Sequence, residues 1–380
     1  MKQIGILIAG IVLVIAIVIG ISATGFLTLN QEKEDIDLGI LLPLSGDAGA
    51  YGEEMKYIFD YTIKEINNKD GINNQKIKAI YEDTKCDGKE AVNALNKLIN
   101  INNIKVTTGW MCSGAVLSAS HIAENNKIII LSSGAGSPEV SFAGEYTFRN
   151  FPSADLAGKK LSEVAINNNH NKISIISENT DYAIGFYKKF KEEFEGKKGK
   201  ITSYNTFESE EKDFKTMLLK INTQDTDALF ISVQTVVSLS NILKNIRELN
   251  IKKPIYFTEH ITEEVLENFK EIIEGGIFVE AELERTEEFI NLKRNIEEEY
   301  NFEFKELPEY YIASSYDAVY ILKEVIEKCK GVNTECIKDE LYSIKNRKGM
   351  TGNISMNQYG DVDVDFTIKV IRDGKIENLN

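Results

Sequence analysis

The feature that most constrains the fold is an alternation of apolar strand patterns and amphipathic helix patterns from residue 36 to about residue 280. Such alternation predicts an α/β protein built from right-handed βαβ crossovers with parallel sheets. The predicted strands are Ile36–Leu42, Ile77–Glu82, Lys105–Thr108, Ile128–Leu131, Lys172–Ile176, Ile201–Phe207, Ala228–Val233, Ile255–Phe257 and Gly276–Glu280. The predicted helices between them are a first one bearing Met55, Phe59, Ile63 and Ile66 on one face, then Gly88–Ile99, Ala115–Glu124, Ala154–Asn167, Tyr182–Phe194, Glu211–Ile221, Val236–Leu249 and Glu263–Ile272.

The last hundred residues follow a different order. Three helix patterns are followed by two strand patterns around a glycine turn, at Glu287–Tyr300, Tyr311–Cys329, Thr334–Ser343, Asn353–Met356 and Asp363–Arg372. One sheet of nine strands would accommodate the alternation, but 380 residues with 43% hydrophobic content favour two α/β lobes. Phe148–Ser153 lies near the middle of the alternation and is interpreted as a crossover between lobes.

The N-terminal segment, residues 1–31, predicts a membrane anchor. Ile4–Ile21 is uncharged and apolar, longer than a signal-peptide core and close to the length of a spanning helix. Lys2 would stay inside and the acidic residues after Glu32 would lie outside. Cleavage near Ala23 is the alternative, and either outcome places the rest of the chain outside the cytoplasm.

The 4 cysteines predict two disulfides, because an even number behind an export segment favours pairing. Cys329 and Cys336 are close enough in sequence to pair, which leaves Cys86 with Cys112. The long loop would contribute about 3 kcal/mol by the chain-entropy estimate. Four buried free thiols are the alternative. The cysteine and histidine spacing does not indicate zinc, and a net charge of -15 argues against a nucleic-acid partner.

Small polar loops follow four of the predicted strands. The first, Ser45–Gly52, has the spacing G-x-x-G-x-x-G and lacks a phosphate-loop lysine, so it does not indicate a nucleotide site. It is either a plain turn or a ligand-lining loop in which Tyr51 covers a ligand. In the second, Ser113 is placed to cap a helix or, with free N–H groups, to hold a carboxylate.

The third loop, Leu131–Glu139, is either a flexible surface loop or one that lets a ligand approach the backbone. In the fourth, Glu259 is either a surface acid or a partner for an amine. In open α/β sheets, ligands gather beyond the carboxyl ends of strands, so the four loops together predict a binding site. The 3 histidines show no catalytic motif, and neither G-x-S-x-G nor H-E-x-x-H occurs, so we expect no enzyme and no cofactor.

Five segments taken together resemble the leucine/isoleucine/valine-type substrate-binding proteins of ABC importers, which have the type I periplasmic-binding-protein fold. These segments are LGILLPLSGDAGAYG, EDTKCDGKEAVNALNKLI, GWMCSGAVLSAS, LSSGAGSPE and GMTGNISMNQYGDVD. The resemblance runs from about Ile36 to the C-terminus. It implies two Rossmann-like lobes with parallel sheets joined by crossover strands. Residues 35–153 and 283–356 would form the first lobe, and residues 154–282 and 357–380 the second.

The resemblance also implies roles for individual residues. Ser113 and the backbone of Ala135 would hold an α-carboxylate, and Glu259 would bind the ammonium group. The remaining implied contacts are Tyr51 and Tyr182, lining the pocket from opposite lobes, and Trp110 and Met111, beside the side-chain subsite.

Two departures from the family pattern concern selectivity. Gly136 stands where the family has a carboxylate-binding threonine, and Ser137 offers a neighbouring hydroxyl in its place. Gln234 and Thr235 stand in a stretch that is aromatic in the family, which predicts a more polar wall. The amino-acid class is retained, but a branched-chain ligand is put in question.

The sequence therefore predicts an extracytoplasmic protein that captures an amino acid between hinged lobes and presents it to an ABC permease. The alternative is a ligand-binding receptor or sensor ectodomain for amino acids or amides. An exported amide-cleaving enzyme would need a nucleophile and a base, which the sequence does not reveal.

Overall fold

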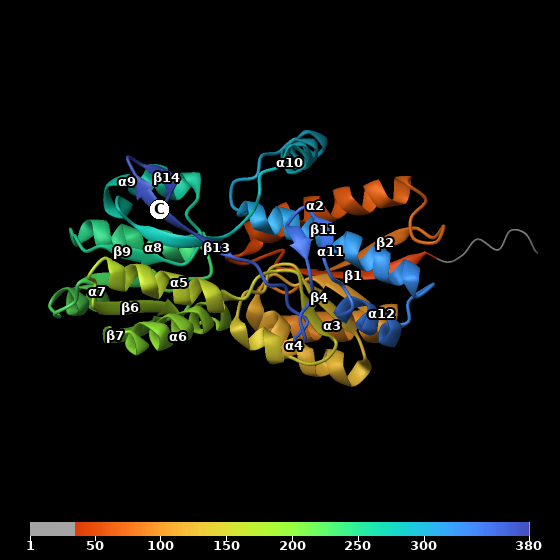
Figure 1. Cartoon of the computed structure of the whole chain (residues 1–380), viewed down its shortest axis with the longest axis horizontal. Coiled ribbons are helices and arrows are strands. Elements are labelled where there is room, and N and C mark those ends of the chain that lie inside the picture. Colours follow the sequence, from red (N-terminus) through yellow and green to blue (C-terminus); the bar gives the residue numbers. More distant parts are fainter. Residues whose placement is uncertain (1–34, 380) are drawn as a thin grey trace, which may run out of the picture.

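The structure, a computed structural model, describes residues 35–379 and forms two α/β lobes side by side (Figure 1). The predicted anchor at residues 1–31 lies outside the described residues, and within residues 35–379 no helix is long and apolar enough to cross a membrane. The lobe at the N-terminal end contains a parallel five-stranded sheet in the order β2-β1-β3-β4-β5. Its elements are β1 (Ile36–Leu42), α2 (Gly49–Asn68), β2 (Ile77–Asp83), α3 (Gly88–Asn102), β3 (Val106–Gly109), α4 (Ser113–Asn126), β4 (Ile129–Ser132), the 3-10 turn η1 (Pro138–Phe142) and β5 (Thr147–Arg149).

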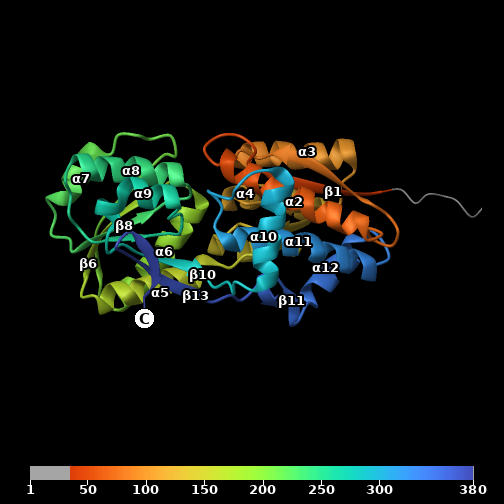
Figure 2. The same ribbon diagram turned by 90° about the horizontal axis from the view of Figure 1, so that it is seen from above.

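The same lobe takes in a later part of the chain. Helix α11 packs against α2, although the two are far apart in sequence (Figure 2). This later part comprises α10 (Glu287–Tyr300), α11 (Glu309–Lys328), α12 (Thr334–Tyr342) and the small hairpin β11 (Arg347–Gly349) and β12 (Gly352–Ile354). The second lobe contains α5 (Ala154–Asn167), β6 (Lys172–Glu178), α6 (Asp181–Gly196), β7 (Lys200–Phe207), α7 (Lys215–Asn222), β8 (Ala228–Ser232), α8 (Val236–Glu248), β9 (Ile255–Phe257), α9 (Glu263–Ile273), β10 (Ile277–Ala281), β13 (Phe366–Arg372) and β14 (Lys375–Asn378).

The second sheet corrects the expectation of wholly parallel sheets. Its order is β14-β13-β10-β9-β8-β6-β7, and β13 and β14 run antiparallel to their neighbours. The chain reaches β13 from the first lobe, not through a crossover helix, and so can enter the sheet in the opposite direction. Asp373 and Gly374, with φ angles of 51° and 70°, form the two-residue turn to β14, where positive φ matches the twist of a hairpin.

Three segments, residues 150–153, 282–286 and 355–365, connect the lobes. The first is shorter than the predicted Phe148–Ser153, because β5 extends through Arg149 and pairs with β4. The nine strands predicted up to residue 280 all form, whereas β5, β11 and β14 were not predicted. Helix α7 begins at Lys215, later than predicted, because the Glu211 carboxylate accepts hydrogen bonds from the N–H groups of Lys212 and Asp213, each at 3.0 Å, and forms a local turn.

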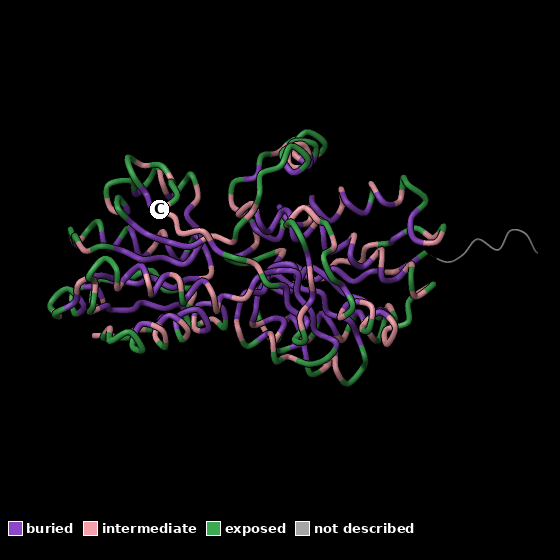
Figure 3. Tube along the Cα trace, in the orientation of Figure 1, coloured by how far each residue is buried: buried purple, intermediate pink, exposed green. Residues whose placement is uncertain are grey.

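Each helix has a buried side and an exposed side (Figure 3), and the buried residues are mostly apolar. The predicted face of α2 is buried, with Met55 and Phe59 at 0% exposure. Both predicted disulfides are present, Cys86–Cys112 with a Cα–Cα distance of 5.3 Å and Cys329–Cys336 with 5.8 Å. The first joins the loop after β2 to the start of α4, so it fixes one of the loops predicted to bind ligand.

Candidate ligand-binding site between the lobes

Side chains of both lobes meet beyond the carboxyl ends of the strands. Tyr51, in the first turn of α2, is buried, and its hydroxyl accepts a hydrogen bond at 3.1 Å from the N–H of Val236, which begins α8 in the other lobe. Burial raises the pKa of Tyr51 far above its usual range, so it stays protonated. A small pocket lies next to this bridge and is lined by Met111, Cys112, Ser113, Gly134, Tyr182, Gln234, His260 and Tyr311.

Ser113 lies at this pocket but is not the helix cap. Helix α4 begins at Ser113, and its N-cap is Cys112, in extended conformation and without a side-chain capping bond. The Ser113 hydroxyl instead accepts a hydrogen bond from the N–H of Ser137 at 3.0 Å. Of the two roles considered for Ser113, capping is therefore not found, and its side chain ties the loop after β4 to the start of α4.

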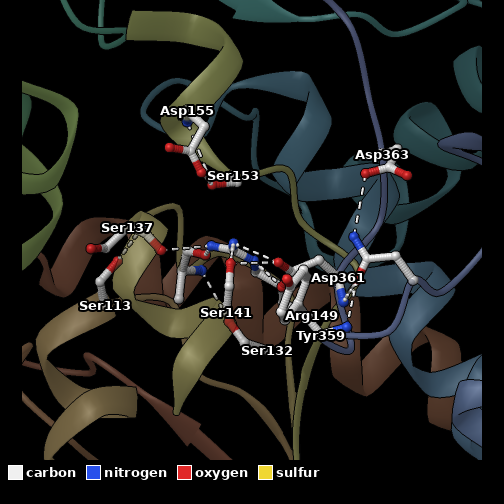
Figure 4. A network of polar contacts seen from close by, with 12 residues as sticks. Ser113, Ser132, Ser137, Ser141, Arg149, Ser153, Asp155, Tyr359, Asp361 and Asp363 are labelled. Atoms are coloured by element: carbon white, nitrogen blue, oxygen red, sulfur yellow. Dashed lines mark hydrogen bonds and ion pairs between the residues drawn. The ribbon is translucent and has the colours of Figure 1, made fainter. Parts of the chain in front are cut away.

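The loop after β4 is held by a buried arginine that the sequence reasoning missed. Arg149, at 0% exposure, donates through Nη1 to the carbonyls of Ala135 and Ser137 at 3.1 and 2.8 Å (Figure 4). Its Nε donates to Asp361 at 2.7 Å, in the third connecting segment. The Ala135 N–H donates to the Ser132 hydroxyl at 3.0 Å. Arg149 thus fixes the loop, and the single charge in the FRNFPS stretch was the available signal.

Gly136 and Ser137 face helix α6 of the other lobe. A Cβ at Gly136 would lie 2.9 Å from a ring carbon of Tyr182, so the tyrosine ring occupies the place of a side chain there. A Cβ at Gly185 would lie 2.8 Å from the Ser137 hydroxyl. That hydroxyl is buried and has no hydrogen-bond partner within the described part of the chain. The absence of a side chain at Gly136 therefore makes room for an aromatic ring from the second lobe.

Glu259 follows β9 and bonds to two tyrosines, Tyr182 of its own lobe and Tyr311 of the other lobe. Its Oε1 accepts hydrogen bonds from the hydroxyls of Tyr311, on α11, at 2.9 Å and of Tyr182, on α6, at 3.2 Å. Burial raises the pKa of Glu259 to about 7, and the two hydrogen bonds oppose this rise. Both partners are neutral, so an ionised Glu259 would gain most from a cationic partner. Tyr311 was not predicted, since a tyrosine at a helix start carries no specific signal.

The remaining predicted residues differ in their surroundings. Trp110 is fully buried, and its indole N–H donates to Thr107 at 2.9 Å, so its ring belongs to the core beside the pocket. Met111 lines the pocket directly. Gln234 also lines it, and its backbone N–H donates to Glu178 at 2.6 Å.

His260 lies in the pocket and was not predicted as a site residue. It is 3% exposed and adopts a φ of +86°. Its Nδ1 lies 3.5 Å from the Tyr51 hydroxyl. Burial lowers its pKa to about 3, so the imidazole is neutral at physiological pH. Within residues 35–379, no group of three or more His, Cys, Asp or Glu side chains could hold a metal ion.

Two lobes of α/β architecture, three connecting segments and polar side chains converging between the lobes define a hinged ligand-binding protein. The chain belongs to the periplasmic binding protein family, whose family model matches residues 35–368.

Similar proteins fall within this class. The chain is 20% identical to the leucine-, isoleucine-, valine-, threonine- and alanine-binding protein of Pseudomonas aeruginosa, over 90% of this chain and 92% of that protein. It superposes on the branched-chain amino acid transporter substrate-binding protein LivJ of Streptococcus pneumoniae, in complex with isoleucine, with a TM-score of 0.78 and 24% identity. The superposition covers 90% of this chain and 98% of LivJ. A solute-binding protein of R. palustris in complex with benzoate superposes with a TM-score of 0.79 and 16% identity. The superposition covers 91% of this chain and 96% of that protein.

Proposed function

We propose that this protein captures a free amino acid between its lobes and delivers it to an ABC importer. The observation that carries the proposal is Glu259, a buried carboxylate between the lobes whose hydrogen-bond donors are two neutral tyrosines. A ligand ammonium group would supply the positive charge that this carboxylate lacks. The amino-acid-binding names of the similar proteins support the same ligand class.

The ligand carboxylate would bind at the start of α4. The first N–H groups of a 14-residue helix and the Ser113 hydroxyl lie at the pocket, and helix N-termini favour anions. The loop fixed by Arg149 would close this end from the side of Ala135. The site thus offers complementary ends for a zwitterion, with Tyr51 and Tyr182 as walls contributed by opposite lobes.

The two lobes would close on the ligand as rigid bodies. We assign residues 35–153 and 283–356 to one lobe and residues 154–282 and 357–380 to the other, joined by the three connecting segments. The bond from Val236 N–H to Tyr51 and the bond from Tyr311 to Glu259 cross between the lobes and would form and break with this motion.

Calorimetric titration with the twenty amino acids and benzoate tests the ligand class. We expect at least one amino acid to bind, and Glu259→Gln to weaken it tenfold or more, because a charge-assisted hydrogen bond is lost. Glu54→Gln is the matched control, since Glu54 is also buried but accepts its hydrogen bonds from the N–H groups of residues 305–307 and not from pocket tyrosines. Binding of benzoate but of no amino acid would refute the proposal.

The apolar segment Ile4–Ile21 supports a further part of the proposal, retention at the outer side of the cell membrane near the permease. Fractionation of cells with alkaline carbonate washing tests it. An anchored protein stays in the membrane pellet and retains its N-terminal residues by mass spectrometry. Recovery of a shortened protein in the soluble fraction would indicate cleavage near Ala23 instead.

A further inference from the structure

His260 lines the pocket between the lobes and has a polar atom that no hydrogen bond uses. Its Nε2 is buried and has no hydrogen-bond partner among residues 35–379. Buried polar atoms are nearly always hydrogen-bonded, so an exception inside a ligand pocket calls for an explanation. The residue also holds a φ of +86°, which glycine or asparagine adopts more readily than histidine. The fold thus places an imidazole here at a conformational cost.

The neighbours of the imidazole determine which nitrogen carries the proton. The Tyr51 hydroxyl already accepts a hydrogen bond from Val236, so its own proton is free to be donated, and Nδ1 of His260 lies 3.5 Å away. A neutral imidazole has one donor and one acceptor nitrogen. If Nδ1 accepts from Tyr51, the proton resides on Nε2. In that tautomer His260, which lines the pocket, has a neutral Nε2–H donor without a partner.

The imidazole of His260 has a polar neighbour in the pocket lining and is packed between two aromatic rings. Gln234, which begins the connection into α8, lines the same pocket and supplies an amide. Tyr182 contacts the imidazole edge-on, with ring centroids 6.2 Å apart, and Tyr51 does so at 6.1 Å. These rings restrict the imidazole, so its Nε2 direction is defined by packing.

We infer that His260 is a specificity-determining residue whose Nε2–H donates a hydrogen bond to an oxygen of the ligand side chain. The inference rests on the proposed amino-acid-binding function and names the ligand class: uncharged amino acids with a carboxamide or hydroxyl side chain. An aliphatic side chain would leave the Nε2–H buried without a partner. A site that hydrogen-bonds its ligand discriminates strongly against an analogue that lacks the acceptor.

Two near-isosteric ligand pairs, asparagine with leucine and threonine with valine, test the inference by calorimetry on the full chain. We expect the wild type to bind the polar member at least tenfold more tightly in one of the pairs. His260→Asn, which tolerates positive φ but has a shorter side chain, should reduce that ratio at least tenfold. His260→Phe should do the same while keeping a ring. His260→Gln, which can place an amide N–H near the position of Nε2, should retain part of the wild-type preference for the polar member.

His170→Phe is the control, because His170 is a half-buried histidine of the same lobe that bonds to Tyr256 outside the pocket. The affinity ratio between the polar and the aliphatic ligand should be the same in His170→Phe as in the wild type. Ratios within one variant are independent of the fraction of folded protein. Equal or tighter wild-type binding of the aliphatic member in both pairs, or an unchanged ratio in His260→Asn and His260→Phe, would overturn the role of His260 alone. Failure of the wild type to bind any amino acid would overturn the proposed function and this inference together.

Discussion

Glu259→Gln should make the ligand-free protein more stable above neutral pH while it weakens ligand binding. The substitution is isosteric and keeps an oxygen to accept from Tyr182 and Tyr311, which both bond to Oε1. It removes a carboxylate whose pKa burial raises from 4.5 to about 7. One pKa unit corresponds to about 1.4 kcal/mol, so ionised Glu259 should cost the folded state about 3 kcal/mol.

The sign of the pH dependence follows from proton binding. Folded Glu259 holds its proton more tightly than unfolded Glu259, so the stability of the wild type is greatest below the unfolded pKa of 4.5. It falls as the pH rises from about 4.5 to about 7, where Glu259 loses its proton in the folded state, and the loss is complete above that pH. Glu259→Gln has no such loss. We expect the free energy of unfolding of the variant to exceed that of the wild type by about 3 kcal/mol at pH 8 and by no more than about 1 kcal/mol at pH 5.

Urea unfolding of both proteins without ligand, followed by circular dichroism at pH 5 and pH 8, measures the difference. Glu267→Gln is the control, because Glu267 is exposed on α9 of the same lobe, and it should change stability by less than about 0.5 kcal/mol at either pH. A Glu259→Gln protein that is less stable than the wild type at pH 8, or a difference that is equal at both pH values, would refute the reasoning.

Three further results are expected. Amino-acid affinity should fall up to tenfold for each pH unit below about 7, because the ammonium requires ionised Glu259, and calorimetry from pH 5 to 8 measures this; a pH-independent affinity would contradict it. Tyr51→Phe, which leaves the Val236 N–H without its acceptor, should weaken ligand binding several-fold through faster dissociation in stopped-flow measurements, whereas an unchanged rate would exclude an interlobe role. Arg149→Met should lower stability by about 3–5 kcal/mol in chemical unfolding, since it leaves Asp361 buried without its partner, and a loss below about 1 kcal/mol would show that the pair is dispensable.

Local signals in the sequence predicted much of the fold. The strand Ile36–Leu42 was predicted to the residue, because a continuous apolar run between turn residues is a strong pattern. The strand β5 was missed, since three residues ending in a charge, Thr147–Arg149, show no periodicity. The reversed direction of β13 was also missed, because a strand pattern does not state which neighbour it pairs with or from which end the chain arrives.

In the candidate site, too, some residues were predicted from the sequence and others were not. Glu259 and Ser113 were predicted because they follow strands and resemble a family motif, and the structure places Ser113 on the pocket and Glu259 between the lobes. Tyr311 and His260 were not predicted, although one bonds to Glu259 and the other lines the pocket. A residue acquires such a role through neighbours that are distant in sequence, and Tyr311 lies 52 residues beyond its partner.

The sequence by itself determined most of the elements, the two disulfide pairings and the chemical type of loop at four strand ends, because periodicity, cysteine spacing and small polar residues are local properties. Only the tertiary structure decided which loops of the two lobes meet, that Tyr182 fills the space beside Gly136, and that His260, which lines the pocket, has a buried Nε2 without a partner among residues 35–379. Burial and hydrogen bonding depend on contacts between segments far apart in the chain. The raised pKa of Glu259 and the lowered pKa of His260 are consequences of that burial.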